Sequence, residues 1–177
     1  MDKLQSLKYV DETDRCYGAA GMAIGLVIFD GEDILAGFSL DGDSADPIEL
    51  TQDFFFAGNP GVSARTAWHQ ILKNFNLGVA IMTSNVMCRY LVSRATGVPD
   101  EVRTALHEAA VTEGADACSL DPDEVDAIFD KNYNYLTRVF THRGVHTVAH
   151  DFAAALQDRR SLSRLDALEL LQALNML

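Results

Sequence analysis

Apolar residues recur at helical spacing through most of the chain, and the clearest stretch runs from Ser63 to Arg94. From Leu77 onward its apolar residues form two stripes, which indicates burial on more than one side. Asn74, Asn76 and Gly78 lie just before or within that second part and predict a kink or short break. The first part places its apolar side chains on one helix face at i, i+3, i+4 spacing: Ala64, Ala67, Trp68, Ile71, Leu72 and Phe75.

The second part of this stretch lacks charged side chains between Lys73 and Arg89. A membrane-spanning helix needs about 20 mainly apolar residues. The uncharged run is shorter and contains several polar residues, so we interpret it as a core helix. Thr83, Ser84 and Asn85 fall inside it, and two interpretations stay open. They bond to backbone or to a neighbouring helix, or they line a pocket or a subunit interface.

The strongest strand signal runs from Met22 to Leu40. Two apolar runs, Ala23–Phe29 and Ile34–Leu40, flank an Asp30-Gly31 pair. An Asp-Gly pair between two such runs predicts a β-hairpin over 22–40. Because a two-stranded hairpin is marginal alone, helices must cover it. Its open edges favour pairing with a second subunit.

Three glycines, Gly18, Gly21 and Gly25, precede or enter the first of these runs. A dinucleotide-binding fingerprint has its glycines after a strand and before a helix, and here the order is reversed. We therefore interpret the three glycines as turn and close-packing residues.

The segment after the predicted hairpin is ambiguous. Asp46-Pro47 suits the start of a helix, whereas Phe54-Phe55-Phe56 also suits a strand, so 47–57 stays open as helix or strand. The Gly-Asn-Pro-Gly sequence at 58–61 predicts a turn into the next helix.

Helix boundaries are well marked in the last part of the chain. A helix is predicted from Pro99 onward and closes at Gly114. Asp121-Pro122 with Glu124 predicts another helix start with a capping box. A final helix is predicted over 161–177, and Ser163 with Asp166 forms its capping box.

Length and composition agree with one globular domain spanning 1–177. The chain has 177 residues, of which 48% are hydrophobic and 23% charged. We predict a predominantly helical α+β fold in which the 22–40 hairpin packs on a helical part over 46–177. That helical part should be a bundle of about five or six helices.

Charge and cysteine usage exclude several classes of protein. The net charge of −12 disfavours nucleic acids and anionic membrane surfaces, so we expect neither as a partner. Cys16, Cys88 and Cys118 are odd in number and widely spaced, which argues against a disulfide framework or a zinc knuckle. The first ten residues lack the apolar core of a signal peptide. Together these features predict a cytoplasmic protein.

Three histidines, His142, His146 and His150, follow each other at i, i+4 and i+8. Adjacent members of such a row can share a metal on one helix face, whereas the first and third lie about 12 Å apart. His150-Asp151 also invites comparison with the metal-binding His-Asp pair of helical HD-type phosphohydrolases. The following residues, 152–154, lack the basic residue that such enzymes carry soon after the pair.

No complete catalytic set is present in the sequence. The leading hypothesis is therefore a non-catalytic cytoplasmic interaction or structural protein that self-associates as a homodimer and needs no cofactor. The first alternative is a metal-dependent, HD-like phosphohydrolase with a divalent metal at His146, His150 and Asp151. The second is a small-ligand-binding helical protein in which the polar run 83–85 forms one wall of the pocket.

Overall fold

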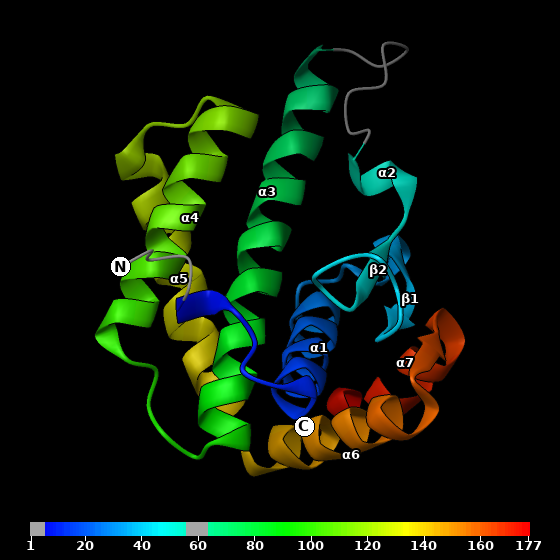
Figure 1. Cartoon of the computed structure of the whole chain (residues 1–177). Coiled ribbons are helices and arrows are strands. Elements are labelled where there is room, and N and C mark those ends of the chain that lie inside the picture. Colours follow the sequence, from blue (N-terminus) through cyan, green and yellow to red (C-terminus); the bar gives the residue numbers. More distant parts are fainter. Residues whose placement is uncertain (1–5, 56–63) are drawn as a thin grey trace.

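The computed structural model describes residues 6–55 and 64–177, and helices dominate it (Figure 1). This confirms the predicted α+β class. Within the described residues, no helix combines the length and hydropathy needed to cross a membrane. The elements in chain order are α1 (Glu12–Ile28), the 3-10 helix η2 (Glu32–Ile34), β1 (Leu35–Ser39), β2 (Ile48–Leu50), α2 (Gln52–Phe55), α3 (Ala64–Met87), the π-helix η3 (Cys88–Ser93), α4 (Asp100–Cys118), α5 (Pro122–Thr141), α6 (Arg143–Arg159), β3 (Ser161–Ser163), α7 (Arg164–Leu171) and the 3-10 helix η4 (Gln172–Met176).

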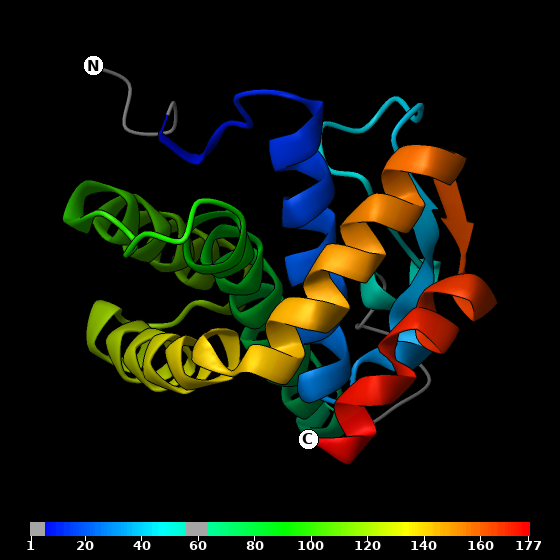
Figure 2. The same ribbon diagram turned by 90° about the horizontal axis from the view of Figure 1, so that it is seen from below.

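Helix α3 stands at the centre of the fold. In Figure 1, α4 and α5 lie on one side of α3 and α1 lies on the other. Helix α6 crosses the end of these helices, while the sheet and α7 lie beyond α1 (Figure 2). Two clusters of buried apolar side chains share α3. One cluster joins it to α1, α6 and the sheet, and the other joins it to α4 and α5.

The prediction of a hairpin over 22–40 is wrong for its first strand, because residues 22–28 are helical and belong to α1. Nearly every side of this helix from Cys16 to Leu26 is enclosed by other elements. An enclosed helix shows no alternation of apolar and polar residues. Its sequence then cannot be told from a buried strand by periodicity alone.

The Asp30-Gly31 pair ends α1 instead of joining two strands. Asp30 adopts a left-handed backbone conformation with φ 54°. The Gly31 N–H then donates to the Leu26 carbonyl oxygen at 2.8 Å. This is a helix C-terminal cap, and Asp is among the few residues that enter the left-handed region readily.

A hairpin does form, but it lies further along the chain. Strands β1 and β2 pair antiparallel, with Phe38 opposite Ile48, and β1 corresponds to the second predicted strand. Strand β3 pairs with the other edge of β1, with Phe38 opposite Leu162, which gives the order β2-β1-β3. The segment 47–57, for which the sequence did not decide between helix and strand, contains both: β2 comes first and α2 follows. Its last two residues lie outside the described range.

The close-packing interpretation of the glycines in α1 is correct at two positions. A Cβ atom added to Gly21 would collide with the backbone oxygen of Ser84, and one added to Gly25 would collide with the Ser84 hydroxyl. Helices α1 and α3 therefore approach each other at backbone contact. Only glycine permits this approach.

Helix α3 runs without the predicted break between its two parts. The Asn74 side chain donates to the Phe54 carbonyl oxygen at 3.0 Å, and Asn76 Oδ1 accepts from Asn132 Nδ2 at 3.0 Å. These amides tie α3 to its neighbours and leave its own backbone hydrogen bonds intact. The irregularity comes later, where the helix widens into the π-helix η3.

The apolar face predicted for the start of α3 is only partly covered. Phe75 is buried, but Trp68 remains 42% exposed. The first turns of α3 extend past the ends of α4 and α1 in Figure 1. The turn predicted at 58–61, the start at Ser63 and the side chains of Ala64 and Ala67 lie outside what the structure describes.

The helix starts predicted at Pro99 and Asp121 are confirmed. The helix end predicted at Gly114 is wrong, because α4 continues to Cys118 and Gly114 lies inside it, packed against Val125 and Phe75.

Asp121 and Glu124 form a reciprocal capping box at the start of α5, and Ser163 and Asp166 form one at the start of α7. The helix predicted over 161–177 is shorter than expected. Its first residues form β3, and its last turns tighten into η4.

Candidate functional site

The histidine row does not assemble into one ligand set. His142 is the N-cap of α6, and its Nδ1 accepts from the Gly144 N–H at 3.2 Å. His146 Nε2 lies 2.6 Å from the Phe140 carbonyl oxygen, and His150 Nδ1 lies 2.7 Å from the Tyr17 hydroxyl. Among residues 6–55 and 64–177, no three His, Cys, Asp or Glu side chains converge on a potential metal position, and this includes His146, His150 and Asp151.

The polar run Thr83, Ser84 and Asn85 is buried between helices. Ser84 packs on the glycines of α1, and Asn85 Nδ2 donates to the Tyr9 hydroxyl at 2.7 Å. The Thr83 and Ser84 hydroxyls have no hydrogen-bond partner in the described part of the chain. The run thus serves helix packing inside the chain. It contributes to neither of the two pockets described below.

A buried arginine at the π-helix was not foreseen from the sequence. Arg89 is 1% exposed, and its Nη2 lies 2.6 Å from Asp14 Oδ2. The same guanidinium donates to the carbonyl oxygens of Leu7 at 2.9 Å and Lys8 at 2.7 Å. Arg89 therefore fastens the segment before α1 to the end of α3.

Asp14 is held in its charged form by this network. Burial alone would raise its pKa, but hydrogen bonds from Arg89 and from the Val10 N–H outweigh burial and lower the pKa. Arg94 adds a second ion pair at 2.9 Å. The Asp14–Arg89 pair is satisfied by the protein itself, so it stabilises the fold and offers little to a ligand.

A shallow polar pocket of about 330 Å³ lies between α4 and α5. His107 there is hydrogen-bonded to Asp126, and Arg103 pairs with Asp130 at 3.4 Å. The Arg103 guanidinium also stacks over the Tyr133 ring at 4.6 Å. Arg103, His107 and Asp130 of this pocket already have partners, and the pocket is smaller and more open, which makes it the weaker candidate.

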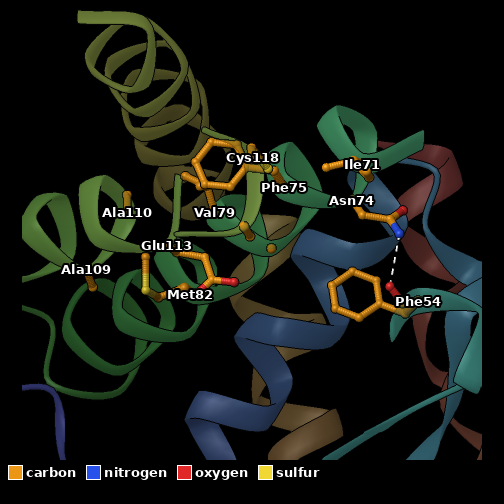
Figure 3. A pocket seen from close by; sticks show the side chains of 12 residues that line it. Phe54, Ile71, Asn74, Phe75, Val79, Met82, Ala109, Ala110, Glu113 and Cys118 are labelled. Atoms are coloured by element: carbon orange, nitrogen blue, oxygen red, sulfur yellow. Dashed lines mark hydrogen bonds between the residues drawn. The ribbon is translucent and has the colours of Figure 1, made fainter. Parts of the chain in front are cut away.

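The larger pocket, of about 650 Å³, lies along α3 between α4 and α2 (Figure 3). We call it the α3/α4 pocket. Most of its wall is apolar. It is lined by Phe54, Ile71, Asn74, Phe75, Gly78, Val79, Met82, Ala109, Ala110, Glu113, Ala117 and Cys118.

Small residues create the space in this pocket. A Cβ atom added to Gly78 would meet no atom of residues 6–55 and 64–177 within 4 Å, so the missing side chain leaves open volume beside α3. Three of the five lining residues of α4 are alanines, Ala109, Ala110 and Ala117, which contribute only methyl groups. Gly114 lets α4 lie close to Phe75, whose ring atoms would be 3.2 Å from an added Cβ.

Two polar residues of the α3/α4 pocket differ in their partners. Asn74 Oδ1 accepts from Gln70 Nε2 at 2.8 Å, and Asn74 Nδ2 donates to the Phe54 carbonyl oxygen. Asn74 is thereby held in place. Glu113 forms no ion pair within the described part of the chain, and its carboxylate points toward the middle of the pocket in Figure 3.

Sequence reasoning placed the polar wall of a ligand site at 83–85, on the wrong side of α3 for this pocket. The lining residues come from α2, α3 and α4, three elements separated along the chain, and their spacing in the sequence does not show that they meet. The available signal was the glycine at position 78 in an otherwise apolar helix.

Comparisons with protein-family models, with curated proteins and with solved structures found no significant match to this chain.

Proposed function

We propose that this protein binds a small, mainly apolar ligand in the α3/α4 pocket. The supporting observation is the pocket itself, with a volume of about 650 Å³ and a wall of apolar side chains around Asn74 and Glu113. Ligand pockets in proteins measure roughly 300–1,000 Å³ and combine an apolar wall with a few polar groups.

The pocket walls suit binding because they are anchored. Phe75, Val79 and Cys118 are each buried against the second core cluster. Asn74 is fixed by two hydrogen bonds, one to α2 and one within α3. A wall that is already in place lowers the entropy lost on binding.

A substitution that fills the pocket tests this proposal. Gly78→Leu places an apolar side chain into the open volume without a backbone collision, since none of the described residues has an atom within 4 Å of the added Cβ. We expect Nile red to bind the unmodified protein saturably with a blue-shifted emission. Gly78→Leu should weaken this binding at least about tenfold, because the leucine side chain occupies the volume that the ligand needs.

Ala115→Leu is the matched control. Ala115 is exposed on α4 and does not line the pocket, so the same side chain is added elsewhere. This variant should bind Nile red like the unmodified protein. Thermal unfolding followed by circular dichroism shows whether each variant is folded. Equal binding by a folded Gly78→Leu variant would disprove the proposal, as would the lack of any saturable binding.

We also propose that the protein self-associates through its C-terminal elements, in line with the leading sequence hypothesis. The supporting observation is that Leu165 of α7 is 77% exposed and Met176 of η4 is 89% exposed. Exposed apolar patches mark interaction surfaces, and methionine is enriched in interfaces between proteins.

Sedimentation velocity tests this second proposal. We expect a dimer in the unmodified protein at tens of micromolar and a monomer after Leu165→Glu combined with Met176→Glu. An exposed pair elsewhere, Val10→Glu with Tyr135→Glu, is the control and should leave the dimer intact. A monomer at high micromolar concentration in the unmodified protein would rule the proposal out.

A further inference from the structure

The charge of the α3/α4 pocket is one-sided. Among its described lining residues, Glu113 carries the only formal charge, and none is Lys, Arg or His. Glu113 has no ion-pair partner within residues 6–55 and 64–177. Its carboxylate reaches into the pocket from α4 (Figure 3). A positively charged group of a ligand would therefore find an unpaired partner here.

The end of α4 adds a second source of negative potential. Ala117 and Cys118 line the pocket and are the last two residues of this helix. The C-terminal end of a helix carries a partial negative charge on its free carbonyl groups. No basic residue offsets it in the last turn of α4, and Asp116 lies in that same turn.

The negative charge acts on the pocket wall itself. Burial raises the pKa of the Cys118 thiol, and the Glu113 carboxylate raises it further. This disfavours an anion in the same space. A carboxylate or phosphate ligand would meet Glu113 and the helix end without any described cation to balance them.

Aromatic rings complete the site. Phe54 and Phe75 line the pocket from α2 and α3. The face of an aromatic ring attracts cations, and its body provides apolar contact area. The wall thus offers an apolar surface for most of a ligand and a carboxylate for one ammonium group.

We infer that the α3/α4 pocket selects a lipophilic amine, a mainly apolar molecule with one ammonium group, over neutral and anionic molecules of the same shape. This inference rests on the proposed ligand-binding function. Beyond that function, it specifies that the ligand carries a positive charge, and it assigns the recognition of this charge to Glu113 and the end of α4.

Three probes of equal length test the inference: octylamine, 1-octanol and octanoate, each displacing Nile red at pH 7. Octylamine is protonated at this pH, since alkyl amines titrate near pH 10. We expect it to displace the dye at about threefold lower concentration than octanol and at least about tenfold lower than octanoate. The ratio of about threefold corresponds to one partly exposed ion pair between the ammonium group and Glu113. The ratio of about tenfold adds the repulsion between Glu113 and the carboxylate of octanoate.

Glu113→Gln should remove most of the difference between octylamine and octanol while leaving octanol binding unchanged. Glu101→Gln is the matched control, because Glu101 is exposed on the same helix and does not line the pocket. It removes the same net charge about 18 Å away along the helix, and should keep the preference for the amine.

The outcomes separate the two proposals. Displacement of Nile red by octanol with no preference for octylamine would overturn the inference and leave ligand binding standing. The same holds if the preference persists in folded Glu113→Gln. If the dye does not bind, or if Gly78→Leu does not weaken its binding, the proposed function fails and the inference fails with it.

Discussion

At the scale of single residues, the fold depends most on a buried ion pair. Arg89 lies in the π-helix and Asp14 in the first turn of α1, and both are almost fully buried. π-helical turns are rare and place a side chain where a regular helix would not. Here the guanidinium donates four hydrogen bonds to three acceptor atoms of the segment before α1 and of α1 itself.

Removal of Arg89 should be costly. Arg89→Met leaves the Asp14 carboxylate and the carbonyl groups of Leu7 and Lys8 without their buried donor. Breaking a buried pair in this way costs about 3–5 kcal/mol in the free energy of unfolding. Chemical denaturation in urea measures the loss.

The exposed pair Arg103–Asp130 provides the comparison for this variant. Both side chains are largely exposed, so Arg103→Met should cost less than about 1 kcal/mol. Equal losses in the two variants would show that burial does not govern the strength of the Arg89 contact.

The same ion pair predicts a pH dependence. The pKa of Asp14 is lowered in the folded protein, so its stabilising contribution is complete above the unfolded-state pKa of about 4. The contribution is lost as the pH falls through the lower, folded-state pKa. Asp14→Asn removes this dependence.

The difference in unfolding free energy between the unmodified protein and Asp14→Asn should therefore be constant above about pH 5 and shrink toward pH 2. Urea denaturation at a series of pH values measures it. A difference that stays the same down to pH 2.5 would contradict the assignment of Asp14 as a charged partner.

At the scale of elements, glycine has opposite roles in two neighbouring helices. In α1, Gly21 and Gly25 allow backbone contact with Ser84 of α3. In α3, Gly78 borders the open volume of the α3/α4 pocket, and the absence of a side chain lowers the intrinsic stability of the helix. The same substitution to alanine should therefore act in opposite directions at the two sites.

Gly21→Ala should lower the free energy of unfolding by about 1–3 kcal/mol, because its Cβ meets backbone atoms that cannot move aside. Gly78→Ala should raise it by about 0.5–1 kcal/mol. Paired thermal and urea unfolding of the two variants measures both effects. Stabilisation by Gly21→Ala would contradict the close approach of α1 and α3.

The features that could be predicted from the sequence are those that depend on neighbouring residues in the chain. The capping boxes at Asp121–Glu124 and Ser163–Asp166 involve atoms within one turn, so the sequence contains all the information needed. Helix α1 was misread because its enclosure by α3 and α6 produced an apolar run without periodicity. Its Asp30-Gly31 end also resembles a hairpin turn.

At the scale of the whole molecule, the functional features depend on contacts between distant parts of the chain. Arg89 meets Asp14 across most of the first half of the sequence, and no local pattern announces a buried charge. The α3/α4 pocket likewise forms because Gly78 of α3 faces alanines of α4. Helix content and fold class could be predicted, while this pairing of elements could not.

The strand order of the sheet determines when the fold can be completed during synthesis. Strand β1 has its second partner in β3, which follows α6 near the other end of the sequence. A ribosome adds about 5–20 residues per second, so a nascent chain carries α1 and β1 for on the order of ten seconds before α6 and β3 emerge. During synthesis the apolar surface of α1 is thus without its final cover, and transiently exposed apolar surface of this kind favours aggregation of a nascent chain.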